Sequence, residues 1–252
     1  MKPIKWNIED EWQPLEAVMM GIGAGMGPAP ALNETYDPLS LRHVQAGTYP
    51  TEEAVKEELD AFATTLEQRG VRVLRPDALG INQVFTRDIG MVIDDLFIMT
   101  HMVEDRELEQ KGLESMLNRN PGRVIYPPKQ VRLEGGDIMP MKNEIWVGYA
   151  KEPDFTTFTT ARTNEAAVEW LAETFPNRRV RGFELKKSDA IPKENALHLD
   201  CCLAALGRGH LMIHAAGFKN PEDMEDVRAS YSEDRIFEMT AEDMKDMKCN
   251  VL

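Results

Sequence analysis

The sequence predicts an α/β fold built from a repeated unit of strands and helices. Short apolar runs alternate with amphipathic segments, turn residues divide several of these runs into hairpins, and the same order of elements recurs along the chain. No linker or low-complexity segment interrupts the sequence. We therefore expect the 252 residues to form a single domain, residues 1–252, with a substantial core.

The clearest element is a helix over residues 51–69, preceded by a strand expected near residue 15. Thr51 is a suitable N-cap, and Gly70 closes the helix. The apolar stripe of this helix consists of Val55, Leu59, Phe62 and Leu66. A short strand, VRVLRP at 71–76, completes the first unit.

The second unit begins with FTRDIGMVIDDLFIMTHM, residues 85–102. Asp94 and Asp95 separate two apolar stretches in this segment, which predicts a hairpin. A helix over residues 105–118 and the strand RVIYPP at 123–128 are expected to follow. The unit therefore has the order hairpin, helix, strand.

The third unit repeats this order. Its hairpin is LEGGDIMPMKNEIWVGYA, residues 133–150, with the turn at Lys142 and Asn143. The segment TNEAAVEWLAETF at 163–175 predicts a helix, and RVRGFEL at 179–185 predicts the closing strand.

The fourth unit opens with LHLDCCLAALGRGHLMIH, residues 197–214, which turns at Gly207-Arg208-Gly209. A helix begun by Asn220 and Pro221 and the strand RIFEMT at 235–240 complete it. The units begin near residues 15, 84, 131 and 197, a spacing too uneven for a solenoid but consistent with insertions into a shared unit.

A fifth unit is expected to begin at MKCNVL, residues 247–252, as a lone first strand. A closed ring of such units would then have a gap, so the C-terminal unit is predicted to be incomplete near 247–252. The exposed sheet edge beside the gap would favour association into a homo-oligomer.

Composition and charge exclude several classes of protein. The net charge of −14 argues against a nucleic-acid partner, because phosphate binding needs clustered Lys and Arg. No run reaches the length of a membrane span, and the N-terminus lacks the apolar core of a signal peptide, so a cytoplasmic protein with no membrane contact is expected. The three cysteines do not form a disulfide framework.

Polar residues open three of the predicted hairpins at equivalent places. They are Asp88 in FTRD, Glu134 in LEGGD, and His198 and Asp200 in HLD. Each segment alone also fits an ordinary structural role, such as an ion pair, a glycine bulge or a buried polar group with satisfied hydrogen bonds. Equivalent positions in successive units, however, would bring these side chains together around a common axis.

The predicted strands also assign faces to these residues, because alternate residues of an extended chain share a face. Asp88 would then point away from Arg87, while His198 and Asp200 would point the same way. Arg132 shares the face of Glu134 and is interpreted as an anchor for a substrate carboxylate.

Converging carboxylates and a histidine suit a planar cation rich in donors, such as a guanidinium. Attack on the central carbon of a guanidinium needs a strong nucleophile, usually a thiolate, and a proton donor for the departing amine. His198 fits that donor and could then activate water. This chemistry needs no organic cofactor and no metal.

Together, FTRD, LEGGD and LHLD resemble the pentein superfamily of guanidine-modifying enzymes, over roughly residues 15–252. Its members include arginine deiminase, dimethylarginine dimethylaminohydrolase and the amidinotransferases. The resemblance implies a five-bladed α/β propeller of ββαβ units around a pseudo-fivefold axis. It also implies a hydrolase acting on arginine or a derivative through a covalent cysteine thiouronium, with an amidinotransferase or a non-catalytic binding protein on the same scaffold as alternatives.

Carried over by position, the resemblance implies that Asp88 and Asp200 bind the guanidinium and that Glu134 and His198 are catalytic. The family nucleophile is a cysteine near the C-terminus, typically after a glycine pair. Cys249 lacks that pair, so it is a minority candidate, and the nucleophile is expected beyond Leu252.

The adjacent cysteines, Cys201 and Cys202, are expected to be packing residues. A zinc site formed by His198, Cys202, His210 and His214 is the less favoured alternative, because no established metal-ligand spacing supports it.

Overall fold

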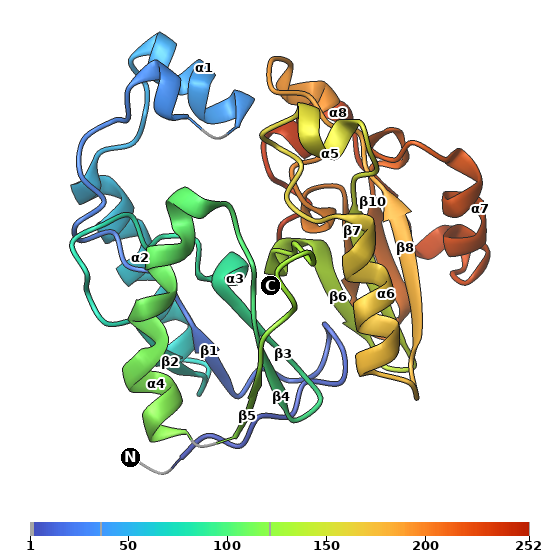
Figure 1. Cartoon of the computed structure of the whole chain (residues 1–252), viewed down its shortest axis with the longest axis horizontal. Helices are drawn as coiled ribbons and strands as arrows, with labels where there is room; N and C mark the ends of the chain where they lie inside the picture. The colour runs from blue at the N-terminus through green and yellow to red at the C-terminus, as the bar shows by residue number, and fades with distance from the viewer. Residues whose placement is uncertain (1–2, 36, 121, 252) are drawn as a thin grey trace.

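The computed structural model describes residues 3–35, 37–120 and 122–251. Its strands form four small sheets (Figure 1), one of two strands and three of three strands. The two-stranded sheet pairs β1 (Ala17–Met19) with β2 (Arg72–Leu74) in parallel. The α/β class expected from the sequence is confirmed.

The three-stranded sheets share one topology, in which an antiparallel hairpin is followed by a third strand parallel to the hairpin's second strand. This is the order expected for the second, third and fourth units. The strands are β3 (Gly90–Ile93), β4 (Leu96–Met99) and β5 (Arg123–Ile125); β6 (Ile138–Met141), β7 (Glu144–Tyr149) and β8 (Arg179–Glu184); and β9 (Leu203–Leu206), β10 (His210–Ile213) and β11 (Ile236–Glu238).

Helices lie between each hairpin and its third strand, between β1 and β2, before the hairpins and after β11. The α-helices are α1 (Pro38–Ala46), α2 (Glu52–Glu67), α3 (Thr86–Ile89), α4 (Glu114–Arg119), α5 (Asp154–Thr157), α6 (Glu165–Thr174), α7 (Pro221–Ala229) and α8 (Ala241–Lys245). The 3-10 helices are η1 (Leu32–Glu34), η2 (Glu104–Leu113), η3 (Gly135–Asp137), η4 (Pro192–Glu194), η5 (Leu199–Cys201), η6 (Gly207–Gly209), η7 (Ala215–Gly217) and η8 (Glu233–Arg235).

The predicted hairpin turns are confirmed by their backbone angles. Asp94, Lys142 and Arg208 have φ values of 53°, 62° and 62°, the left-handed conformation that tight turns require. The N-cap of α2 is also confirmed, since the Thr51 side chain accepts a hydrogen bond from the Ala54 amide. Phe62, however, is 45% exposed, and Ala63 takes its expected place in the core.

Two expectations about elements are wrong. The helix predicted over 105–118 is divided into the 3-10 segment η2 and the short helix α4. The lone strand predicted at 247–252 is absent from its described part, 247–251, where the backbone bonds within its own turn instead. Met247 has a left-handed φ of 59°, and the Asn250 amide donates to the Met247 carbonyl, so this segment offers no ladder to a neighbouring strand.

The core of the described residues consists of several apolar clusters, and the two largest lie between neighbouring sheets. The β3–β4 and β6–β7 hairpins pack together through Ile93, Ile98 and Ile145, with Leu171 of α6 over them. A larger cluster lies under β9 and β10 and includes Leu203, Phe218 and Cys202. Because each hairpin packs against the next, the residues that open the hairpins are held near one another.

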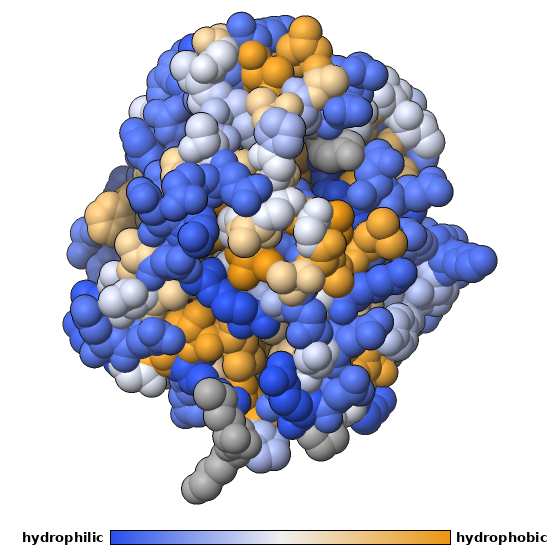
Figure 2. Space-filling model, turned by 90° about the vertical axis from the view of Figure 1, so that its left-hand side faces the viewer, coloured by the Kyte–Doolittle hydropathy of each residue, from blue (hydrophilic) through white to orange (hydrophobic). Residues whose placement is uncertain are grey.

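On the face shown in Figure 2, hydrophilic residues predominate and apolar residues lie among them in small groups. None of the helices in the described residues combines the length and apolar character needed to cross a membrane. The four sheets of the described residues do not establish the five blades that the family resemblance implies.

Candidate active site

Three short helical turns, α3, η3 and η5, position the candidate site. Each one immediately precedes the first strand of a hairpin. Each is closed by an equivalent hydrogen bond: Asp88 N–H to Phe85 O, Asp137 N–H to Glu134 O, and Cys201 N–H to His198 O. The first residues of each hairpin segment therefore form a turn, and the assignment that pointed Arg87 away from Asp88 is wrong. An α-helical turn rotates successive side chains by about 100° and a 3-10 turn by about 120°, instead of the 180° of a strand.

The turns bring the predicted acids and histidine together. His198 Nε2 lies 3.0 Å from Glu134 Oε2, and His198 Nδ1 lies 3.6 Å from Asp88 Oδ1. All three residues are buried, with 5%, 0% and 7% of their surfaces exposed for His198, Glu134 and Asp88. The imidazole is thus held between two carboxylates from two different units.

The Gly-Gly pair of LEGGD makes this approach sterically allowed. A Cβ on Gly136 would lie 2.6 Å from His198 Nδ1, and a Cβ on Gly135 would lie 2.0 Å from the Arg87 carbonyl oxygen. Any side chain at these positions would push α3 and the imidazole away from Glu134.

Asp200 joins the cluster through Arg87. Arg87 Nε lies 3.3 Å from Asp200 Oδ2, although the alternation expected for an extended chain pointed Arg87 away from the site. Asp200 is 7% exposed. The four residues predicted as site acids and base therefore do converge, but a fifth residue, Arg87, converges with them.

A guanidinium already occupies this cluster. Arg106 of η2 places Nη1 2.8 Å from Asp88 Oδ2 and 3.8 Å from Glu134 Oε2, while Nε and Nη2 pair with Glu109 at 2.8 and 3.0 Å. The guanidinium also lies 5.9 Å from the centre of the Phe85 ring. Arg106 was not predicted from the sequence. The available signal was that a buried carboxylate needs a charged partner, which indicates that a basic residue lies near Asp88 and Glu134.

Arg162 supplies a second guanidinium. Its Nη1 lies 3.3 Å from both oxygens of Glu134, and Arg162 is only 4% exposed. Arg132, predicted as a carboxylate anchor, instead donates from Nη2 to the Met102 carbonyl. Glu134 Oε1 accepts a hydrogen bond from the amide of Val103, the residue that follows Met102. Arg132 and Glu134 therefore contact the same short segment of chain, and no ion pair between these two residues is observed.

Burial and charge set the protonation of the cluster. Burial opposes a charge on His198, but Asp88, Asp137 and the hydrogen bond to Glu134 outweigh it and raise the pKa of His198 to about 9. Burial likewise disfavours ionised Glu134, yet the hydrogen bond from His198 and the charge of Arg162 hold its pKa well below its usual range. At neutral pH the pair is imidazolium and carboxylate.

The pKa values of Asp200 and Asp137 are raised, unlike that of Glu134, because burial is the largest effect on both and outweighs the neighbouring positive charges. Burial raises the pKa of Asp200 to about 6 against the opposing charges of Arg87 and His198. Burial also raises the pKa of Asp137, which is fully buried and accepts from the Leu199 amide at 3.0 Å. Asp137 was not predicted, and the D of LEGGD was the signal for it.

The cysteines do not present a reactive thiol to this cluster. Cys201 Sγ lies 3.7 Å from Asp200 Oδ1, but burial and that charge raise its pKa well above the usual value. Cys202 Sγ donates to the Leu199 carbonyl at 3.5 Å and packs in the β9–β10 core, as expected. Cys249 is buried, and burial together with Asp243 raises its pKa to about 11.

The zinc alternative is not supported by the positions of its residues. His214 Nδ1 pairs with the Met239 carbonyl at 2.8 Å, and His210 pairs with the Gly207 carbonyl and stacks on Phe237. In the described part of the chain, the one group of donors close enough to share an ion is Asp88, Glu134 and His198, within 4.8 Å of one another. Arg106 pairs with Asp88 and Arg162 pairs with Glu134, so guanidinium groups of the chain itself contact these carboxylates.

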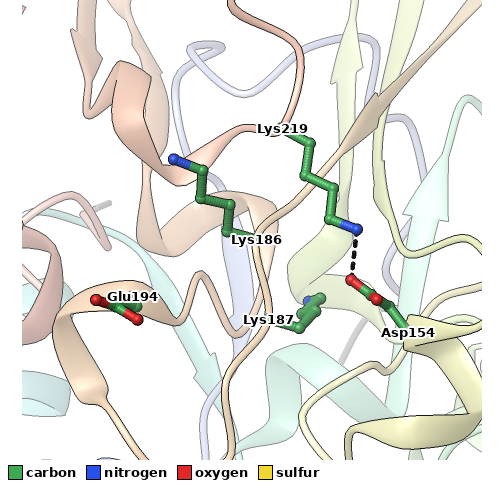
Figure 3. Close-up of a pocket in the computed structure, with 5 residues that line it drawn as sticks. All are labelled: Asp154, Lys186, Lys187, Glu194 and Lys219. Carbon is green, nitrogen blue, oxygen red and sulfur yellow. Dashed lines mark ion pairs between the residues drawn. The ribbon is translucent and has the colours of Figure 1, made fainter.

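A pocket of about 370 Å³ lies beside the cluster and is shown in Figure 3. Lys219 points to Asp154 across it, 2.5 Å away, while Lys186 and Glu194 point elsewhere. Lys187 also lines the pocket and donates to the Ala196 and Leu197 carbonyls, directly before His198. The pocket therefore borders the backbone that carries His198, but Asp88, Glu134 and Asp200 are not among its lining residues.

Known proteins share this fold. The N-terminal domain of ArgZ in its C264S mutant form, an arginine dihydrolase from Cyanobacteria, superposes with a TM-score of 0.71 at 16% identity, covering 94% of this chain and 80% of that one. SxtG, an amidinotransferase from Microseira wollei, gives a TM-score of 0.68 at 20% identity, covering 92% and 75%. These two similarities concern the fold.

A sequence relative is the N(G),N(G)-dimethylarginine dimethylaminohydrolase of Streptomyces coelicolor, 27% identical over 161 residues. The match includes 63% of this chain and spans 56% of that protein's own length. The family match, this relative and the shared fold place the chain in a class of proteins, the pentein superfamily. Residues 41–252 match the family described as N,N dimethylarginine dimethylhydrolase, eukaryotic, and the chain belongs to that family.

Proposed function

We propose that this protein hydrolyses the guanidino group of a methylated arginine, with arginine itself as the second candidate substrate. The observation that carries the proposal is the cluster of Asp88, Glu134 and His198 with a guanidinium held against it, that of Arg106. The cluster thereby has the negative charge and the hydrogen-bond acceptors that a substrate guanidinium requires. Membership of the dimethylarginine dimethylhydrolase family supports the methylated substrate.

In this proposal each residue has a defined role. Asp88 and Asp200 accept hydrogen bonds from the substrate guanidinium, and His198, protonated at neutral pH, donates a proton to the departing amine. Glu134 keeps His198 charged and oriented through the 3.0 Å hydrogen bond. Arg132 remains a proposed anchor for the substrate carboxylate once it leaves the Met102 carbonyl.

The reaction proceeds in two balanced steps. A thiolate attacks the guanidinium carbon, the bond from that carbon to the methylated terminal nitrogen breaks, and the amine leaves with the proton from His198. His198 then takes a proton from water as the resulting hydroxide attacks the thiouronium carbon. The carbon–sulfur bond breaks to release the thiolate, and the hydroxyl proton is lost to the departed amine, which leaves a neutral urea product and an ammonium ion.

Arg106 has to leave Asp88 for a substrate guanidinium to take its place. Arg106 lies on η2, ten residues of 3-10 helix, whereas runs of this helix longer than about four residues are uncommon and often mark hinges. We infer that the substrate displaces Arg106 by a local movement of η2, since Glu109 on the same segment remains its partner.

The nucleophile in this proposal is not Cys201, Cys202 or Cys249. All three are buried with raised pKa values, so little thiolate is present at neutral pH. We propose that the attacking thiol is not one of these three. The same observation favours the second candidate function, a protein that binds a guanidino compound without turnover.

The decisive experiment is calorimetric binding of N,N-dimethylarginine and arginine to this chain, with ornithine, which lacks the guanidinium, as the control ligand. Binding of the two guanidino compounds but not ornithine, weakened at least about tenfold by Asp88→Asn, is the expected result. Equal binding of all three ligands, or no effect of the substitution, would contradict it.

Turnover is then tested on the protein translated from the complete reading frame. Release of citrulline and dimethylamine indicates the hydrolase. Transfer of the amidino group to an added amine indicates the amidinotransferase instead, and binding without either product indicates the binding protein.

A further inference from the structure

The N-terminal segment, residues 3–13, lies outside the family match, which begins at residue 41. It nevertheless crosses the ends of three hairpins. Ile8 pairs with Asp94 at the β3–β4 turn, Asp10 pairs with Met141 at the β6–β7 turn, and Trp12 lies beside Gly207 at the β9–β10 turn. A segment that joins three units can place a side chain between them.

Backbone contacts hold this segment firmly. The Ile8 and Asp94 amides exchange hydrogen bonds of 3.0 and 2.7 Å, and the Glu9 carbonyl accepts from the Lys142 amide at 2.8 Å. Trp6 is buried against Phe97, with ring centres 5.3 Å apart. Residue 11 is thus presented by a fixed backbone, which reduces the conformational entropy lost when its side chain is ordered.

Glu11 directs its carboxylate at Arg87. Oε2 lies 3.4 Å from Nη1 and Oε1 lies 3.4 Å from Nη2, the paired arrangement in which a carboxylate faces the end of a guanidinium. The Glu11 side chain is 22% exposed and the Arg87 side chain 42% exposed. Arg87 Nη2 also approaches the Ile138 carbonyl at 3.5 Å, so both Nη atoms have partners other than Asp200.

Arg87 consequently offers Asp200 a single N–H. Its Nε lies 3.3 Å from Asp200 Oδ2, whereas Oδ1 accepts a long hydrogen bond of 3.7 Å from the Cys201 thiol. A carboxylate paired in this way keeps one oxygen for another donor. If the Nη atoms were released, Arg87 could turn to pair with both oxygens of Asp200.

We propose that Glu11 is a positioning residue: it holds the Nη atoms of Arg87 so that Asp200 keeps one oxygen for the guanidinium of the substrate. This inference rests on the proposed function for the identity of the ligand. The charged groups that face Asp200 are Arg87 and Asp88 of α3, Asp137 of η3 and His198 of its own segment. Of these, only Arg87 pairs with a residue of the N-terminal segment.

The test compares Glu11→Gln with Glu9→Gln in the full chain. Glu9 is exposed, belongs to the same segment and makes its hydrogen bonds through its backbone carbonyl and amide. Its substitution therefore removes the same formal charge without releasing Arg87. In E11Q the affinity for N,N-dimethylarginine should fall roughly three- to tenfold, since Arg87 then competes for both oxygens of Asp200. E9Q should bind as the unmodified chain does.

A second readout needs no ligand. Titration of the Asp200 side-chain carboxyl carbon by NMR, assigned with Asp200→Asn, should show a lower pKa in E11Q than in the unmodified chain, because a second N–H bond favours the carboxylate. Glu11→Asp keeps the charge on a shorter side chain and should give an intermediate value; it serves in place of E11Q should that variant not fold.

An Asp200 pKa that is unchanged or raised in these variants would overturn the proposal, even if the melting temperature falls, because a merely structural contact lowers stability alone. If the unmodified chain binds no guanidino compound, the proposed function fails separately, and the Asp200 titration still decides the role of Glu11.

Discussion

The charged state of His198 makes a quantitative prediction about stability. Replacing it by glutamine, His198→Gln, removes an imidazole that is 5% exposed and held between Glu134 and Asp88. Its pKa is about 9 in the folded chain, against an ordinary value of 6.5. Because the folded-state pKa is the higher one, protonation stabilises the fold; this stabilisation is complete below pH 6.5 and is lost as the pH rises through 9.

The two pKa values give the size of the effect. The stabilisation from protonated His198 should be about 3 kcal/mol at pH 6, about 1 kcal/mol at pH 8 and close to zero at pH 10. The variant also loses packing contacts, but that loss does not depend on pH. The difference in unfolding free energy between the unmodified chain and H198Q should therefore shrink by about 3 kcal/mol from pH 6 to pH 10.

Urea unfolding at three pH values measures this difference by linear extrapolation. The matched control is His43→Gln, which removes an exposed imidazole whose Nδ1 contacts Thr48. A difference for H198Q that stays constant with pH, or grows as the pH rises, would refute the interpretation that the two carboxylates keep His198 protonated. NMR titration of the His198 ring gives the same pKa directly.

Three further predictions follow from the geometry. Gly136→Ala should weaken binding of N,N-dimethylarginine at least about tenfold, because the added Cβ would lie 2.6 Å from His198. The control is Gly207→Ala, whose Cβ would lie 3.5 Å from its nearest neighbour and which should bind normally. Equal affinities of the two variants would contradict the close approach of Gly136 and His198. The three buried thiols should resist alkylation by iodoacetamide at pH 7 in the folded chain and react after unfolding, which mass spectrometry measures. Rapid labelling of Cys249 in the folded chain would make it a nucleophile candidate again. Glu134→Gln should destabilise the chain by about 3–5 kcal/mol in urea, because it removes a buried carboxylate that pairs with both Arg162 and His198. A loss below about 1 kcal/mol would contradict that pairing.

Several features of the fold follow from local sequence patterns. The α2 helix, its Thr51 cap and the three hairpin turns depend on contacts within a few residues, so they could be predicted. The repeated order of elements then indicated that Asp88, Glu134 and His198 would meet. The geometry of their approach could not be predicted in the same way, because α3, η3 and η5 are single turns too short to show helical periodicity.

The partners of the site residues were also beyond local reasoning. The sequence separation is 18 residues between Arg106 and Asp88 and 28 residues between Arg162 and Glu134. It is 76 residues between Glu11 and Arg87. Nothing in a sequence window reports such a pairing, since it depends on which hairpins pack together. Asp137 and Lys187 were missed because their importance comes from burial, which raises the pKa of the acid and lowers that of the lysine.

The sequence by itself determined the α/β class, the repeating unit and the set of acids and histidine that open the hairpins, because spacing and residue chemistry are local properties. The tertiary structure decided what those residues do to one another. It placed His198 between two carboxylates, put an internal guanidinium on Asp88 and brought Glu11 to Arg87. Such effects arise only when buried charges from distant segments share one desolvated space, where each group sets the protonation and orientation of the next.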